Sequence, residues 1–240
     1  NPVAQQIPRT RFPEKLGFCT FSTASNVVYQ FKSIYYLFFL TNVLKIDILT
    51  AGTILTLGTI WDAVNDPLMG WLTDRTVSRW GRRRPWLLFG AVPFGIAFWL
   101  HWIVPPLDAN GLFWYYLMVA LLLDTALTIV GVPYTALTPE LTGDYDERTS
   151  LNTYRFGFSI LGGVLAAFFH NQIVVAYAPN RALGAAVSVG IWAVLGALGL
   201  LWTFLGTRGY AERSVPKNVE NEVGFLDGMR QAFSNRAFML

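Results

Sequence analysis

Long apolar runs separated by short polar joins recur six times along the chain. A helix needs about 20 residues to cross roughly 30 Å of hydrocarbon, and each run is close to that length or longer. The pattern predicts six transmembrane helices over approximately Leu16–Leu44, Leu49–Thr73, Pro85–Val104, Leu112–Thr138, Tyr154–Tyr177 and Leu183–Leu205. Because lipid offers the backbone no hydrogen-bond partners, a bundle of helices is the arrangement that satisfies these groups internally. The predicted fold class is therefore an all-α membrane protein.

The composition agrees with this reading. Hydrophobic residues make up 53% of the 240 and charged residues only 14%, whereas soluble domains have about a quarter of their residues charged. The single cysteine, Cys19, excludes an intrachain disulfide and a zinc cluster. No nucleophile–His–Asp set, phosphate loop or dinucleotide motif is found, so the chain is not predicted to be an enzyme.

The basic residues predict the orientation. Of the 18 lysines and arginines, 15 fall near the side of the membrane that holds both termini, and only Lys45 and Arg181 fall in joins on the other side. The positive-inside rule then places both termini in the cytoplasm, in a plasma (cytoplasmic or inner) membrane. Arginines concentrated in membrane loops also explain the net charge of +3 without a nucleic-acid partner.

The chain divides into three parts. Residues 1–15 are predicted as a cytoplasmic tail, residues 16–205 as the six-helix bundle, and residues 206–240 as a cytoplasmic linker. This linker contains an amphipathic segment, Phe225–Phe233, and its last residues, SNRAFML, resemble the opening of a seventh helix. The sequence therefore reads as half of something larger.

Two carboxylates lie near the middle of the second predicted span, in WDAVNDP. Asp62 and Asp66 share one helix face at i and i+4, and each costs about 2.5–3.5 kcal/mol at a helix centre. Two close carboxylates also repel, so an empty site should hold at least one proton. Asn65 adds an amide oxygen, and Pro67 lacks an N–H and so frees the carbonyl of Ala63. Oxygen ligands of these kinds suit a hard cation.

An alternative involves no ion. In that interpretation one of the two aspartates pairs with Lys32 and the other caps a kink. Lys32 lies deep in the first span, where its charge suggests an ion pair with Asp124 or Asp62. Lys32 could equally point outward to the far interface.

The loop after the second span reads GWLTDRTVSRWGRRRP, from Gly70 to Pro85. It resembles the loop between the second and third helices of the major facilitator superfamily, a gate latch formed by charge pairs. With WDAVNDP before it and PYTALTPELTGDYDERTSLNTYRF after it, the chain resembles the glycoside–pentoside–hexuronide:cation symporters, the melibiose permease-like family. The resemblance covers essentially all 240 residues and implies the N-terminal half of a 3+3 inverted-repeat fold.

The resemblance assigns roles residue by residue. Asp62, Asn65 and Asp66 match cation-site positions, and Thr128 on the fourth span matches the hydroxyl that completes the site. Apart from a coupling Na⁺ or H⁺, no cofactor or metal is implied. The gating and structural charges of this reading are Lys32, Asp74, Arg75, Arg82, Arg83 and Arg155.

The substrate site departs from the family pattern. The two carboxylates that grip the sugar in a galactoside carrier of this type fall here at Asn26 and Gly131. The residues that could rebuild the site are Asn26, Tyr29, Ser33 and Asp124. A sugar or glycoside is the first expectation for the substrate, and an amphiphile, as in lysophospholipid-transporting relatives, is the second.

Two functions remain open from the sequence. The first is a cation-coupled symporter that works by alternating access, with a second six-helix half as partner across the polar face and lipid around it. The second is a non-transporting structural or assembly subunit whose exposed face is covered by another protein. In both, the third and sixth spans, with Phe94, Phe98, Trp192 and Leu195, should be apolar and peripheral. His101 and His170 are expected to be interfacial residues without a metal.

Overall fold

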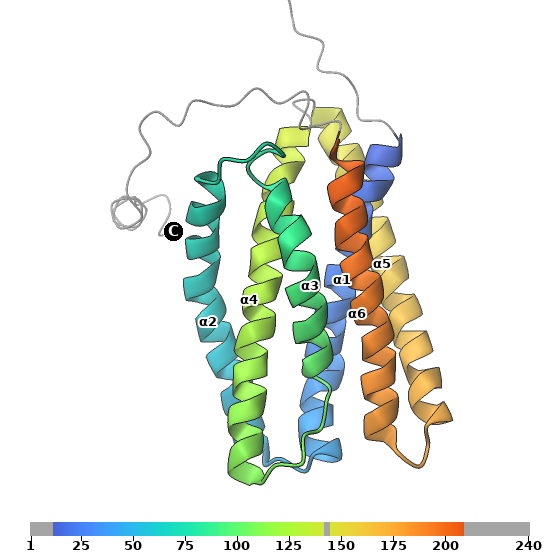
Figure 1. The fold of residues 1–240 in the computed structure, drawn as a ribbon. Helices are drawn as coiled ribbons and strands as arrows, with labels where there is room; N and C mark the ends of the chain where they lie inside the picture. Colours follow the sequence, from blue (N-terminus) through green and yellow to red (C-terminus); the bar gives the residue numbers. More distant parts are fainter. Residues whose placement is uncertain (1–11, 142–144, 209–240) are drawn as a thin grey trace, which may run out of the picture.

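The computed structural model describes residues 12–141 and 145–208. In these ranges the chain forms six α-helices, which run roughly alongside one another as a bundle (Figure 1). The helices are α1 (Phe12–Gln30), α2 (Ile48–Asp74), α3 (Arg84–Leu100), α4 (Ala109–Leu141), α5 (Tyr145–Ala176) and α6 (Arg181–Gly206). The six predicted spans correspond to these helices in order. The predicted tail and linker lie largely outside the described residues.

The first span does not keep α-helical geometry throughout. After α1 it continues as the π-helical segment η1 (Phe31–Tyr36) and then η2 (Phe39–Val43). A π-helical turn contains an extra residue and is frequent at functional sites. Lys32, which lies deep in the first span, is the second residue of η1, so this unusual backbone surrounds a charged side chain.

The helix ends follow local chemistry. Asp47 caps α2, because its side chain accepts hydrogen bonds from the backbone N–H groups of Leu49 and Thr50. Gly81 adopts a φ of 90° in the turn that leads into α3, a conformation that favours glycine. Two boundaries differ from the prediction, since α1 begins at Phe12 within the expected tail and α5 begins at Tyr145 rather than Tyr154.

The packing has the symmetry of two intertwined three-helix units. Helix α1 packs against α5 and α6, just as α4 packs against α2 and α3, and α3 packs against α6. These pairings are kept when α1–α3 are exchanged for α4–α6, as a 3+3 repeat requires, but α5 also packs against α6 without a comparable contact between α2 and α3. By length and composition α4 (over Ala109–Thr138), α5 and α6 can each cross a membrane, and α3 is a shorter apolar helix.

Small residues bring α1 and α6 close together. A Cβ atom added to Gly17 would lie 2.9 Å from the Cα of Gly206. The hydroxyl of Thr203 donates to the carbonyl of Gly17 at 2.7 Å, and that of Thr20 donates to the carbonyl of Gly199 at 3.0 Å. Small residues and hydroxyl bonds are the usual means of joining helices in lipid.

The interior corrects the expectation for α3. Phe94 and Phe98 were expected on a peripheral face, but they are 0% and 1% exposed. Their rings lie edge-on against Phe21 and Phe31 of the first span. On α6, Leu195 is exposed, whereas Trp192 is partly buried against the core. The reason is that α3 lies between α4 and α6 and so buries one of its faces.

Candidate functional site

Three polar residues, Asp62, Asn65 and Asp66, lie near the middle of α2 along its length. Asn65 is buried, Asp62 is partly buried and Asp66 is exposed in the described bundle. Helix α2 runs without interruption through Pro67, although the missing proline N–H leaves the carbonyl of Ala63 without its usual partner. The three side chains therefore lie within little more than one helical turn.

Asp66 and Thr128 meet between α2 and α4. The hydroxyl of Thr128 donates to a carboxylate oxygen of Asp66 at 2.8 Å, and Thr128 is only 6% exposed. The exposed side chain of Asp66 therefore points toward α4 and not away from the bundle. Among residues 12–141 and 145–208, no group of three or more His, Cys, Asp or Glu side chains has the arrangement of a metal site. The role of Asp62, Asn65, Asp66 and Thr128 as cation ligands stays a prediction.

Lys32 pairs with Asp124. Its ammonium group donates to one carboxylate oxygen of Asp124, which joins the first span to α4. This is one of the two partners that the sequence suggested, and it excludes the outward-pointing alternative for the described conformation. Gly58 of α2 borders the pair, because a Cβ atom there would lie 2.7 Å from the other oxygen of Asp124.

The predicted substrate residues lie close to this pair along the first span. Tyr29 is 58% exposed and Ser33 is also exposed. Asn26 accepts a hydrogen bond from Gln30 at 3.0 Å, and both side chains lie against Gly163 of α5, where a Cβ atom would collide with them. Asp124 is 1% exposed and is engaged by Lys32, so in this conformation it is not open to a substrate.

The predicted gate charges gather where α2 ends. The guanidinium of Arg83 lies 2.9 Å from a carboxylate oxygen of Asp74, and Arg82 donates to the backbone carbonyl of the same residue at 3.5 Å. Arg75 lies over the ring of Trp71, 4.4 Å from its centroid. This group holds the start of the α2–α3 loop against the end of α2.

Arg155 lies apart from that group, on α5. Its guanidinium carbon is 5.8 Å from the ring centroid of Tyr134, whose hydroxyl donates to the carbonyl of Phe18 at 2.8 Å. On the same side of the bundle, Lys15 pairs with Glu147 at 2.6 Å. These contacts tie α1, α4 and α5 together at one end.

The sequence reading gave no individual role to Arg84, which is 2% exposed. Its guanidinium donates to the hydroxyl of Thr207 at 3.1 Å and to the carbonyl of Phe204, and it lies over the Phe204 ring. Arg84 therefore binds the C-terminal end of α6, where the helix dipole favours a cation. The sequence did hold a signal for this role. An arginine at the first position of a helix is unfavourable for that helix's own dipole, which indicates that Arg84 has a partner elsewhere.

The two histidines correct another expectation. His101 is 1% exposed and its ring lies 3.9 Å, centroid to centroid, from that of Tyr36. His170 is 5% exposed, and its Nδ1 lies 3.0 Å from the hydroxyl of Ser188. Both are packed inside the bundle rather than interfacial. Helix contacts that are distant in sequence decide this burial.

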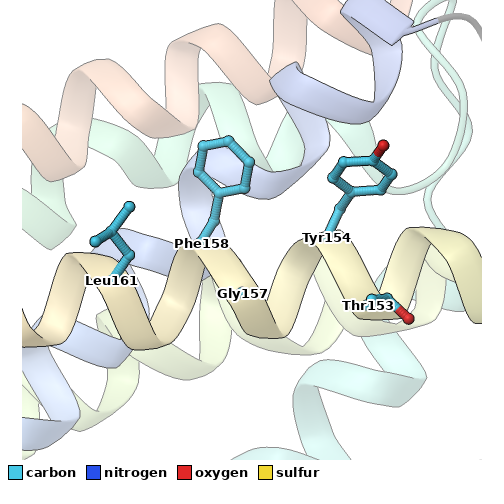
Figure 2. Close-up of a pocket in the computed structure, with 5 residues that line it drawn as sticks. All are labelled: Thr153, Tyr154, Gly157, Phe158 and Leu161. Atoms are coloured by element: carbon cyan, nitrogen blue, oxygen red, sulfur yellow. The ribbon is translucent and has the colours of Figure 1, made fainter.

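Two hollows on the surface lie away from these polar residues and are lined mostly by apolar side chains. Figure 2 shows one along α5, a shallow pocket of about 250 Å³ lined by Thr153, Tyr154, Gly157, Phe158 and Leu161. A groove of about 440 Å³ has a lining from α1, α5 and α6 that includes Trp192 and Trp202. Neither of these two hollows includes a predicted cation ligand.

Comparison with known proteins gives consistent matches. The family model described as MFS/sugar transport protein matches residues 17–240. An uncharacterized symporter of Synechocystis sp., sll1374, is 40% identical over 82% of this chain and 37% of its own length. The uncharacterized symporter YnaJ of Bacillus subtilis is 34% identical over 99% of this chain and 51% of its own. The sodium-dependent lysophosphatidylcholine symporter 1-A of Danio rerio is 38% identical over 57% and 26%. The chain thus spans about half or less of the length of these relatives.

Proposed function

Because the chain belongs to the MFS/sugar transport protein family, we propose that it is the N-terminal six-helix half of a cation-coupled symporter. The observation that best supports the proposal is the Thr128–Asp66 hydrogen bond between α4 and α2, with Asp62 and Asn65 on the same helix as Asp66. The partner is a second six-helix half packed about a pseudo-two-fold axis, with the substrate held between the halves. The family assignment favours this function over a non-transporting assembly subunit.

The coupling ion binds at Asp62, Asn65, Asp66 and Thr128 in this proposal. Carboxylate, amide and hydroxyl oxygens are the ligand types that a hard cation such as Na⁺ prefers. A cation also relieves the repulsion between two carboxylates at i and i+4. The sodium-dependent relative supports Na⁺, and H⁺ is the alternative occupant.

The substrate contacts the first span at Asn26, Tyr29 and Ser33. The family description supports a sugar or glycoside. One observation favours a less polar molecule, because Asn26 and Gly131 occupy the two positions where a galactoside carrier of this type has carboxylates. The exposed ring of Tyr29 offers a stacking surface to either class.

Both termini lie in the cytoplasm and the protein lies in the plasma (cytoplasmic or inner) membrane. The support is the distribution of lysine and arginine, because Lys15, Arg83, Arg84 and Arg148 lie at or next to the starts of α1, α3 and α5. These three helix starts lie at the same end of the bundle (Figure 1). The gate of the proposed transport cycle is at this end.

The test replaces Asp66 with Asn in the full-length protein. This variant keeps the shape of the side chain and removes its charge, so gradient-driven accumulation should fall to the level set by diffusion while the protein still folds. Uptake of labelled sugar or lysolipid into proteoliposomes is measured against Na⁺ and H⁺ gradients. Asp108→Asn is the matched control, because Asp108 lies just before α4 and asparagine also caps a helix. Undiminished accumulation by the Asp66→Asn protein would show that the pair is structural.

A further inference from the structure

The Lys32–Asp124 ion pair has no role in the proposed function. It joins the first span to α4, whereas the proposed cation site joins α2 to α4. Buried ion pairs inside a membrane are expensive and mark functional sites by default. The pair is therefore a feature whose presence needs a reason.

Asp124 is held in an incomplete environment. Its side chain is 1% exposed, one oxygen accepts from Lys32, and the other accepts no hydrogen bond from the residues that the structure describes. That second oxygen points at Gly58 of α2, one turn before Asp62. A buried carboxylate with a free oxygen that faces α2 is available to the charges on that helix.

Lys32 is less confined than its partner. Its side chain is 21% exposed, and it belongs to the π-helical segment η1, where the backbone is wider than in an α-helix. Asp124 lies one turn before Thr128 on α4, and the Thr128 hydroxyl bonds Asp66, while the second oxygen of Asp124 faces Gly58, one turn before Asp62 on α2. The four residues thus form one electrostatic unit of three carboxylates and one ammonium group.

We propose that Lys32 is a resident cation of this unit, which neutralises Asp124 and leaves a single exchangeable monovalent cation to the Asp62–Asp66 pair. The inference rests on the proposed function, since it concerns the affinity and number of coupling ions. An ammonium group tethered to the first span occupies the charge position that a second soluble ion would otherwise take. Lys32 is a specificity-determining residue in this account, because it sets how strongly the site attracts Na⁺.

The experiment measures Na⁺ binding to the full-length protein in detergent by isothermal titration calorimetry. The wild type should bind one Na⁺ per chain. Lys32→Met should tighten binding about tenfold and Asp124→Asn should weaken it about tenfold, the size expected for one unit charge near a partly solvated site. The double variant Lys32→Met/Asp124→Asn should return to within about threefold of the wild type, because the two charge changes cancel.

A merely structural pair gives a different result. Both single variants would then lower the melting temperature and leave Na⁺ affinity unchanged, or shift it in the same direction, and either outcome overturns the inference. Where a single variant does not fold, the charge-reversed pair Lys32→Asp/Asp124→Lys decides, because it preserves the net charge. A change of tenfold or more in its Na⁺ affinity would also overturn the inference.

Different results would contradict the proposed function and the inference about Lys32. If Asp66→Asn keeps full accumulation, the cation site itself is wrong, whatever the Lys32 variants show. If the wild type binds no Na⁺ but Lys32→Met does, the inference stands and the wild-type coupling ion is H⁺. If neither binds Na⁺ and Asp66→Asn still abolishes accumulation, the inference is overturned and the proposed function survives.

Discussion

A buried and a partly buried cation, Arg84 and Lys32, lie in this bundle in contrasting surroundings. Arg84 is 2% exposed and reaches the Thr207 hydroxyl, the Phe204 carbonyl and the Trp80 carbonyl at the end of the bundle. Lys32 is 21% exposed and has, among residues 12–141 and 145–208, one ion-pair partner, Asp124, in the middle of a span. Arg84 is therefore fixed from several directions, whereas Lys32 depends on a single contact.

The difference follows from what each location offers. The end of α6 supplies unpaired backbone carbonyls and the negative end of a helix dipole, so a guanidinium can be satisfied there without a carboxylate. The middle of a span has its backbone groups already bonded, so an ammonium group needs an acidic side chain. A transporter requires such a division, because the ends must hold the helices while the centre rearranges.

The largest effect should come from removing the fixed cation. Arg84→Ala leaves a cavity and takes the charged donor from Thr207 and Phe204, which should cost about 3 kcal/mol of stability. The matched control is Arg83→Ala, because Arg83 pairs with the exposed Asp74 and such a pair is worth about 1 kcal/mol or less. Thermal unfolding of the full-length protein in detergent measures both.

Arg84→Lys separates charge from geometry. Lysine keeps the positive charge but lacks the planar fork that reaches two acceptors together, so about half of the lost stability should return. Equal melting temperatures for the Arg83→Ala and Arg84→Ala proteins would show that the buried Arg84 stabilises this end no more than the partly buried Arg83.

These two arginines also show the limit of the sequence. The six helices followed from apolar runs alone, and α2 was predicted over Leu49–Thr73 and found over Ile48–Asp74. Arg83 and Arg84 are identical in type and adjacent, yet Arg83 pairs with Asp74 at the end of α2 whereas Arg84 binds the end of α6, far along the chain. Side-chain direction at a loop–helix junction depends on that distant packing, so composition and spacing could not distinguish them.

The second prediction changes the surroundings of the Lys32–Asp124 ion pair. In Gly58→Ala the new methyl group would lie 2.7 Å from the buried oxygen of Asp124, so the carboxylate must shift and its contact with Lys32 weakens. We expect a loss of about 1–2 kcal/mol of stability, typical of overpacking. Gly52→Ala on the same helix is the control, since nothing lies within 4 Å of a Cβ atom there.

The measurement is again the melting temperature, together with Na⁺ affinity. Gly52→Ala should be neutral or slightly stabilising, because alanine favours a helix over glycine by up to about 1 kcal/mol. If Gly58→Ala is equally harmless, the Asp124 carboxylate moves without loss of stability, and its contact with Lys32 contributes little to the bundle.

The candidate site was only partly visible in the sequence. The i and i+4 spacing placed Asp62 and Asp66 on one face, and the family resemblance pointed to Thr128. The π-helical turns at Lys32 could not be predicted, because a change in hydrogen-bond register leaves no mark on hydropathy. Nor could the function of Gly58 be read, since a glycine in a membrane helix has several uses.

The smallest expected effect comes from removing the hydrogen bond between the Thr128 hydroxyl and Asp66. Asp66 has a hydroxyl partner in Thr128, whereas Asp124 has an ammonium group. Thr128→Val keeps the shape and removes one hydrogen bond, worth about 1 kcal/mol, so Na⁺ affinity should fall roughly fivefold with little change in folding. Thr135→Val on the same helix is the control, because its hydroxyl bonds only carbonyls of its own helix among the described residues. Calorimetry with Na⁺ compares the two variants. Equal affinities would mean that the Thr128 hydroxyl packs the α2–α4 contact without serving the ion, and Asp62, Asn65 and Asp66 would then have to complete the site without it.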